Sequence, residues 1–237
     1  MKLQIGNSSN FELRSEVVTV TKDIKLKFLF LSDFHFRKGS RALADSILVC
    51  CRKVSPDFVV LGGDYIESKK GLSVLDGFIK SLSLITEVIA IPGNHDYYFG
   101  LSKIQSAFEN NGCSWIDKES KVIYVNEIAI QIDGNYQSDK LGGDINILCC
   151  HNPKLFNTIS SGYDVALAGH LHGCQIVFWE SKDELYPGAL FYKWNGLRFI
   201  NNGVKILVSK GLGDTIPIRY NCAKEVIEIS IQGNSKK

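Results

Sequence analysis

Apolar runs alternate with helical patterns through the first two thirds of the chain. Each run is short, continuous and stopped by Gly, Pro, Asp or Asn, which predicts a buried strand. The segments between them repeat apolar residues every three or four positions, which predicts amphipathic helices. Ser40 stands where it would cap the first helix. The expected strands are 26–31, 58–61 and 87–91, and the expected helices are 41–54, 72–82 and 101–110.

The pattern becomes richer in strands after residue 112. Asn126-Glu127 and Asn202-Gly203 each lie between two apolar runs, and Asn-Gly in particular is a strong hairpin signal. A short helix is expected from Pro153, and the polar tail at 232–237 is expected to fray. The expected strands are 121–125, 128–132, 145–150, 164–168, 175–178, 197–201, 204–209 and 225–231.

The length of 237 residues favours a single domain, spanning 1–237. Apolar residues make up 45% of the chain and charged residues 22%, as in soluble globular proteins. The net charge of +2 gives no support for nucleic acid as a partner.

No stretch resembles a signal peptide or a transmembrane helix, so a cytoplasmic location is expected. Seven cysteines, an odd number, favour buried reduced thiols over a disulfide framework.

All five histidines fall inside four short motifs, and Gly62-Gly63-Asp64 adds a carboxylate. Imidazole is the commonest nitrogen ligand of divalent metals, so this concentration suggests one metal site. A single buried histidine is more often a hydrogen-bonded core residue than a ligand. Five histidines that all lie in such motifs favour metal ligation over a role in the core. The histidine motifs are Asp33-Phe34-His35, Asn94-His95-Asp96, Cys150-His151-Asn152 and His170-Leu171-His172.

Each of these motifs directly follows an expected strand, and ligand sites in α/β sheets lie beyond the carboxyl ends of the strands. The candidate ligands offer carboxylate and amide oxygen and imidazole nitrogen without thiolate, a set that suits Mn²⁺, Fe, Zn²⁺ or Mg²⁺. Seven ligands are too many for one ion that must also hold water. Two ions ~3.5–4 Å apart that share a carboxylate would use all seven.

At these motifs the sequence resembles the calcineurin-like metallophosphoesterase family. The family pattern is Asp-x-His, Gly-Asp-x-x-Asp, Gly-Asn-His-Asp/Glu, a lone His and Gly-His-x-His, and this chain has the five blocks in that order between residues 33 and 172. The resemblance implies a four-layer α/β/β/α sandwich with two mixed sheets. It also implies a hydrolase of phosphoric ester or diphosphate bonds that uses two divalent ions. Mn²⁺ is the ion expected first.

The resemblance assigns the ligands in two sets. One ion would be held by Asp33, His35 and His172 and the other by Asn94, His151 and His170, with Asp64 and a hydroxide between them.

Two catalytic residues follow from the same resemblance. His95 would face the scissile phosphate, and Asp96 would hydrogen-bond to His95 and raise its pKa, although capping of the next helix is an equal alternative for Asp96. Glu67 stands where the family has Asp, so it is expected to accept a hydrogen bond rather than to bind metal.

A narrower resemblance rests on the segments 209–213 and 217–220, which look like a small bacterial subgroup near YkuE and YaeI. Some relatives of that subgroup are UDP-2,3-diacylglucosamine pyrophosphatases of lipid A synthesis. The resemblance therefore implies a phosphorylated small-molecule or lipid-linked substrate and a peripheral contact with the inner membrane face. A generic phosphodiesterase acting on a small soluble substrate and a non-catalytic scaffold are the alternatives.

Substrate contacts are the least specific part of the sequence. Lys210 and Arg219 are candidates for binding substrate phosphate, although solvated surface charges are common. Tyr97, Tyr98 and the aromatic-rich stretch 186–199 would either line the substrate cleft or pack on the sheet, and packing is the preferred expectation.

Overall fold

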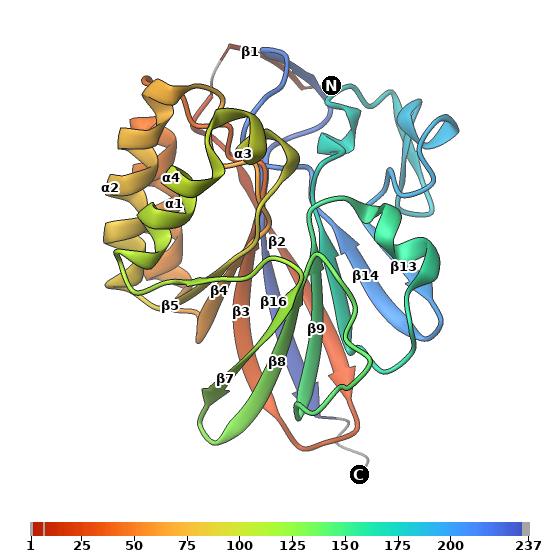
Figure 1. Ribbon diagram of the computed structural model, residues 1–237. Coiled ribbons are helices and arrows are strands. Elements are labelled where there is room, and N and C mark those ends of the chain that lie inside the picture. The colour runs from red at the N-terminus through yellow and green to blue at the C-terminus, as the bar shows by residue number, and fades with distance from the viewer. Residues whose placement is uncertain (1, 7, 234–237) are drawn as a thin grey trace.

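Two six-stranded mixed sheets pack face to face in the computed structural model, which describes residues 2–6 and 8–233 (Figure 1). Helices cover the outer face of the first sheet, and short 3₁₀ helices and loops cover the second. The expected sandwich of two mixed sheets is confirmed. Its fourth layer differs in being built from 3₁₀ segments, of which the longest is Pro153–Thr158.

The first sheet carries the earliest strands of the chain and its last one. The helices packed on it are α1 (Arg41–Val54), α2 (Leu72–Ser83) and α4 (Leu101–Glu109), and a short α3 (Asn94–Phe99) precedes α4. In spatial order its strands are β2 (Glu12–Val20), β16 (Glu225–Gly233), β3 (Lys25–Leu31), β4 (Phe58–Leu61), β5 (Glu87–Ala90) and β6 (Ser114–Trp115).

The second sheet contains both expected hairpins, which are confirmed at Asn126-Glu127 and Asn202-Gly203. Its order is β13 (Arg198–Asn201), β14 (Val204–Val208), β10 (Val165–Ala168), β9 (Ile145–Cys150), β8 (Ile128–Gly134) and β7 (Glu119–Val125). Two small ribbons complete the fold. They pair β1 (Leu3–Ile5) with β15 (Ile218–Tyr220) and β11 (Trp179–Ser181) with β12 (Glu184–Tyr186).

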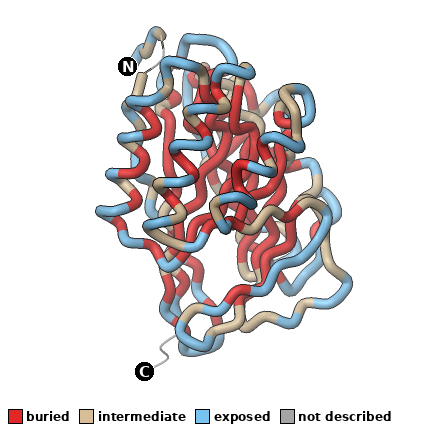
Figure 2. Tube along the Cα trace, turned by 60° about the vertical axis from the view of Figure 1, so that its left-hand side comes forward, coloured by how far each residue is buried: buried red, intermediate tan, exposed pale blue. Residues whose placement is uncertain are grey.

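The interior is divided by the first sheet, because successive residues of a strand point to opposite faces. Phe28 and Phe30 face the second sheet, whereas Leu29 and Leu31 face the helices, and all four are fully buried. Figure 2 shows the buried stretches of chain in the middle of the molecule and exposed stretches around them. Burying each such side chain contributes roughly 1.5–3 kcal/mol. This two-sided burial explains why strand β3 ends in a continuous apolar run, residues 28–31, rather than an alternating one.

Several local expectations were wrong. Residues 175–178 form no strand, because Cys174 and Gln175 have left-handed φ values of 56° and 57° that break the extended path. Ser40 precedes α1 but makes no side-chain cap; its Oγ accepts from the backbone N of Arg37. Strand β16 runs to Gly233, so residues 232 and 233 are not frayed, and 234–237 lie outside the described residues.

Strand β2 was missed because it buries only one side and carries Glu12, Arg14 and Glu16.

The seven cysteines, all in the described part, are free thiols, five of them buried. Within that part, no helix has the length and apolar composition needed to cross a bilayer.

Strands β3, β4 and β5 run parallel in the first sheet, and β9 and β10 run parallel in the second. The carboxyl ends of each set therefore lie along one edge, where ligand sites form in such sheets. The motifs at Asp33, Asp64, Asn94, His151 and His170 all start at these ends.

Candidate metal centre

The backbone is strained where it presents the candidate ligands. Five of the seven have left-handed φ values, which are unusual for residues with a side chain: Asp33 at 56°, His35 at 44°, Asp64 at 57°, His170 at 73° and His172 at 52°. Such conformations cost of order 1–3 kcal/mol each and persist only where the surrounding structure enforces them.

Hydrogen bonds between neighbouring loops enforce part of this strain. The backbone N of Asp33 donates to the carbonyl of Gly63 at 3.0 Å, and that of His35 donates to the carbonyl of Asp64 at 2.9 Å. The backbone N of His170 donates to the Asp33 carboxylate at 3.0 Å. The loops that follow strands β3, β4 and β10 are thereby joined by hydrogen bonds of the candidate ligand residues.

Two motif glycines make room for carboxylates. A Cβ on Gly93 would lie 2.2 Å from Oδ1 of Asp64, and a Cβ on Gly169 would lie 2.2 Å from Oδ2 of Asp33 and 2.0 Å from Oγ of Ser32. No real Cβ tolerates such distances, so glycine is required for the close approach of one loop to the next.

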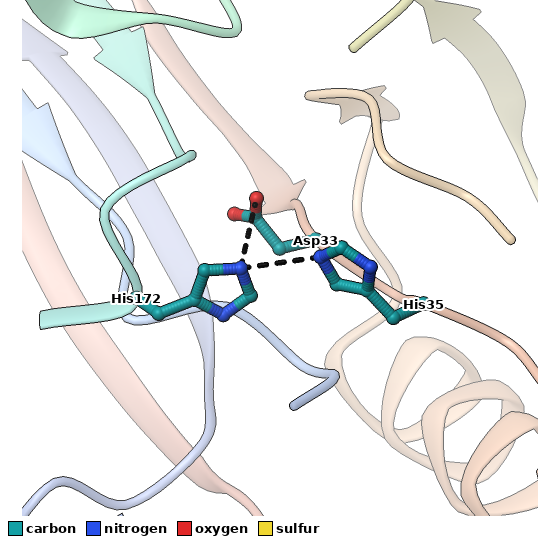
Figure 3. Close-up of side chains that lie close together, drawn as sticks. All are labelled: Asp33, His35 and His172. Carbon is teal, nitrogen blue, oxygen red and sulfur yellow. Dashed lines mark hydrogen bonds and ion pairs between the residues drawn. The ribbon is translucent and has the colours of Figure 1, made fainter. Parts of the chain in front are cut away.

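The first cluster joins Asp33 and His35, which follow β3, to His172, which follows β10 (Figure 3). Nε2 of His172 lies 3.2 Å from Nε2 of His35 and 3.6 Å from Oδ1 of Asp33. All three side chains are buried and point at one another.

The second cluster joins Asn94, His151 and His170. Nε2 of His151 lies 3.0 Å from Oδ1 of Asn94 and 3.2 Å from Nδ1 of His170. The structure thus brings together the residues that the resemblance assigned to the second ion.

Asp64 lies between the two clusters. Its Oδ2 is 3.7 Å from Nε2 of His35 and 3.2 Å from Nε2 of His151. Its other oxygen, Oδ1, accepts from the backbone N of His95 at 2.8 Å. One carboxylate oxygen therefore faces donor atoms of both clusters, as a bridging ligand would.

The outward hydrogen bonds of the histidines fit divalent ions. Nδ1 of His151 must donate to the carbonyl of Gly62 at 2.8 Å, and Nδ1 of His35 donates to Glu67 at 2.7 Å. Each neutral ring then turns an unprotonated Nε2 inward. Facing lone pairs repel one another unless a cation or a proton lies between them, so the donor set suits metal.

Charges within the cluster shift several pKa values. Burial lowers the pKa of His151, but the hydrogen bond and charge of Asp64 outweigh it and raise the pKa to about 9. Burial and the neighbouring His151 lower the pKa of His170 to about 4. Burial, His35 and the Arg219 guanidinium hold the pKa of His172 well below its usual value. His170 and His172 therefore stay neutral and able to bind metal at pH 7.

His95 lies at the mouth of the centre, with 27% of its side chain exposed. Its Nδ1 is 3.3 Å from Oε2 of Glu67, the same oxygen that binds His35. Glu67 thus accepts a hydrogen bond, as the sequence suggested, and it also orients His95, which the sequence did not suggest. The only signal in the sequence is its place three residues after Asp64.

Asp96 does not act on His95 in the expected way. Its Oδ2 accepts from the backbone N of Gly93 and Asp64, at 2.7 and 2.9 Å, and its Oδ1 accepts from that of Tyr65 at 2.9 Å. The side chain is fully buried and occupies the third position of α3. The expected hydrogen bond from Asp96 to His95 is therefore wrong, and Asp96 instead fixes the two loops that carry Asp64 and His95.

Arg219 and Lys210 are both bound by other groups of the protein. The Arg219 side chain is 2% exposed and binds Asp214 at 2.6 Å, and its Nη2 donates to the carbonyls of Lys210 and Gly213. Nζ of Lys210 lies 3.2 Å from buried Glu225. A buried guanidinium with carbonyl and carboxylate partners serves the packing of the loops. Contact of Arg219 and Lys210 with substrate phosphate stays a prediction.

The aromatic residues divide between packing and exposure. Trp194 packs edge-on against Phe156 and Phe199. Phe191, in contrast, is 77% exposed and lines a recess together with His170. Tyr98 is 84% exposed, so the expectation that it packs was wrong.

Comparisons with known proteins agree with this geometry. The family model described as calcineurin-like phosphoesterase matches residues 26–174. Protein YpbG of Bacillus subtilis is 28% identical over 88% of this chain and 82% of its own length. The phosphodiesterase YaeI of Escherichia coli is 24% identical over 93% of this chain and 88% of its own length.

A metallophosphoesterase of Campylobacter jejuni, Cj0846, is 26% identical over 92% of this chain and 62% of its own length. Among solved structures, the NAD nucleotidase of Haemophilus influenzae covers 80% of this chain with a TM-score of 0.50 and 14% identity, and the match spans 46% of that protein. At this identity the likeness concerns the fold alone.

Proposed function

We infer that this chain, which belongs to the calcineurin-like phosphoesterase family and is a metal-dependent phosphoester hydrolase, uses two divalent ions to cleave a phosphodiester or pyrophosphate bond. The observation that carries the inference is the position of Asp64, whose Oδ2 faces His35 at 3.7 Å and His151 at 3.2 Å. A single carboxylate shared in this way is typical of centres with two ions ~3.5–4 Å apart.

The side chains divide the work. Asp33, His35 and His172 would hold one ion, and Asn94, His151 and His170 would hold the other. When bound, the pair would supply a water molecule of lowered pKa and neutralise the phosphoryl oxygens.

His95 is free to meet the substrate because it is partly exposed at the mouth. A ring nitrogen oriented by Glu67 would protonate the leaving oxygen or stabilise its developing charge. One oxygen of Glu67 contacts both His35 and His95. Glu67 therefore couples the first ion site to His95, the proposed general acid.

The test is hydrolysis of bis-p-nitrophenyl phosphate with Mn²⁺, the ion we propose, and with Zn²⁺, Mg²⁺ and Fe²⁺. We expect turnover and close to two bound ions per chain. A protein that binds fewer than one ion per chain and hydrolyses neither this diester nor p-nitrophenyl phosphate would instead be a scaffold with this fold.

For the substrate we propose a lipid-linked pyrophosphate of the UDP-2,3-diacylglucosamine kind. Support comes from exposed apolar side chains on the β11–β12 ribbon and the 3₁₀ turn that directly follows it. Phe178, Trp179, Leu190 and Phe191 are 51–77% exposed. Phe191 also lines the recess that contains His170, and exposed apolar side chains of this kind suit peripheral contact with a bilayer.

Two measurements test the lipid proposal. The enzyme should release UMP from UDP-2,3-diacylglucosamine in mixed micelles and should sediment with anionic phospholipid vesicles. Leu190→Asp should reduce sedimentation, whereas Leu84→Asp, at a more exposed leucine after α2, should not. Hydrolysis of small diesters without either result would favour a small soluble substrate.

A further inference from the structure

A recess of about 230 Å³ opens beside the metal centre, on the side of the second cluster. One wall is His170, and the others come from the 3₁₀ segment after β9 and from the loop before β13. Apart from Asn152, His170 and Leu171, the residues that line the recess lie outside the histidine motifs.

His170 places the recess within reach of a reacting phosphate. Its Nδ1 is 3.2 Å from Nε2 of His151, and both rings belong to the group that surrounds Asp64. A substituent that is attached to the bound phosphoryl group and extends to this side passes the ring of His170 and enters the recess.

The other walls are aromatic. Trp194 forms a fixed wall, because it packs edge-on against Phe156 and Phe199 and its Nε1 donates to Asn157 at 3.2 Å. Tyr192 is 50% exposed and Phe191 is 77% exposed in the same recess. Aromatic faces left in solvent next to a fixed indole provide a stacking surface for a flat ring.

The polar groups of the recess offer mostly donors. Oδ1 of Asn152 accepts from the backbone N of Lys154, and Oδ1 of Asn157 accepts from Trp194 and Lys193. These bonds orient each amide so that its NH₂ group is directed away from them. With the ammonium of Lys154 at the rim, the recess favours a ligand that carries acceptor oxygens.

The volume selects a small occupant. Pockets for drug-sized ligands measure roughly 300–1,000 Å³, so about 230 Å³ holds one ring system rather than a pair of acyl chains. Any acyl chains of a lipid substrate would have to lie outside it.

We propose that this recess binds a planar heteroaromatic ring bearing carbonyl acceptors, of the nucleobase kind, joined through a sugar to the phosphate that the centre hydrolyses. The proposal rests on the proposed function and specifies its substrate as a nucleotide ester.

The experiment compares two esters with the same leaving group, thymidine 5′-(p-nitrophenyl phosphate) and methyl p-nitrophenyl phosphate. The ratio of their kcat/KM values should favour the thymidine ester by about tenfold or more, as expected for one base stacked on aromatic side chains. Tyr192→Ala should lower this ratio about tenfold, and Tyr192→Phe should keep it. Tyr124→Ala, at an exposed tyrosine on β7, should leave it unchanged.

A binding measurement separates failure of the recess from failure of the enzyme. Thymidine 5′-monophosphate should bind to the intact protein in calorimetry, and Tyr192→Ala should weaken this binding even if no ester is cleaved. Equal kcat/KM values for the two esters, or a ratio that Tyr192→Ala leaves unchanged, would overturn the recess proposal and leave the phosphodiesterase standing.

Discussion

Nε2 of His35 and Nε2 of His172 face each other at 3.2 Å, although the two residues are 137 positions apart in the sequence. Nδ1 of His35 is already committed to Glu67, so its proton lies outside the pair. At this distance either a proton or a bound cation must lie between the two nitrogens.

Metal affinity should rise with pH up to about 9. The pKa of His151 is raised to about 9, so below that pH the ring carries a proton that an incoming ion must displace. One displaced proton gives a roughly tenfold gain in affinity per pH unit. Calorimetric titration with Mn²⁺ between pH 6 and 9 in two buffers of different ionisation enthalpy measures this release. An affinity that is flat over this range would contradict the assignment of His151.

His95→Ala should abolish most turnover and leave metal binding intact. The ring lies at the mouth, and its loss removes a group that contributes ~10²–10⁴-fold as a general acid. The measurement is kcat on bis-p-nitrophenyl phosphate together with metal content. Because His95 also has a ring nitrogen within 4.8 Å of donor atoms of His35 and Asp64, loss of one ion in this variant would reassign it as a ligand.

Glu67→Gln should weaken both metal binding and turnover. A neutral amide still reaches Nδ1 of His35 and Nδ1 of His95 but removes the charge that orients the two rings. Partners of ligand histidines typically contribute 10–100-fold to metal affinity or activity. Glu119→Gln, at an exposed glutamate on β7, is the control, and equal behaviour of the two variants would contradict the role of Glu67.

Asp96→Asn should destabilise the fold. Both carboxylate oxygens accept backbone N–H groups, so an amide would turn an NH₂ group toward at least one buried donor. We expect a loss of ~1–3 kcal/mol in the free energy of unfolding. Denaturant titration measures it. A variant of unchanged stability but reduced kcat would restore Asp96 as a direct partner of His95.

Gly169→Ala should disrupt the centre. The new Cβ would lie 2.2 Å from Oδ2 of Asp33, which must move away from its ligand position. Metal content and kcat should both fall. The matched control is Gly77→Ala on α2, where a Cβ meets nothing within 4 Å and should stabilise the helix by ~0.5–1 kcal/mol. Full metal content in Gly169→Ala would show that the loop moves and the Asp33 carboxylate keeps its position.

Local patterns predicted the strands that are buried on both faces. Residues 26–31 and 58–61 were found because continuous apolar runs followed by Asp or Gly are rare outside such strands. Strand β2 escaped because Arg14 and Glu16 sit on its partly buried face and bind Glu225, Arg198 and Lys205. A buried ion network cannot be distinguished from a solvated strand by polarity alone.

Among the functional residues, those with a fixed spacing were predictable. The ligand residues follow strand ends and keep motif order, so the sequence predicted seven residues that the structure brings together. The hydrogen bond from Asp96 to His95 was mispredicted because the partners of Asp96 are backbone groups. These partners, like the carboxylates that bind Arg219 and Lys210, become neighbours only after the chain has folded.

Strand β16 lies between β2 and β3, although it is made long after both of them. Strand β3, which leads into Asp33, has no partner on that side until residues 225–233 have been made. At ribosomal rates of 5–20 residues per second, the interval after β3 lasts roughly 10–40 s. The unpaired edge of β3 is open to chaperones and to aggregation over that time.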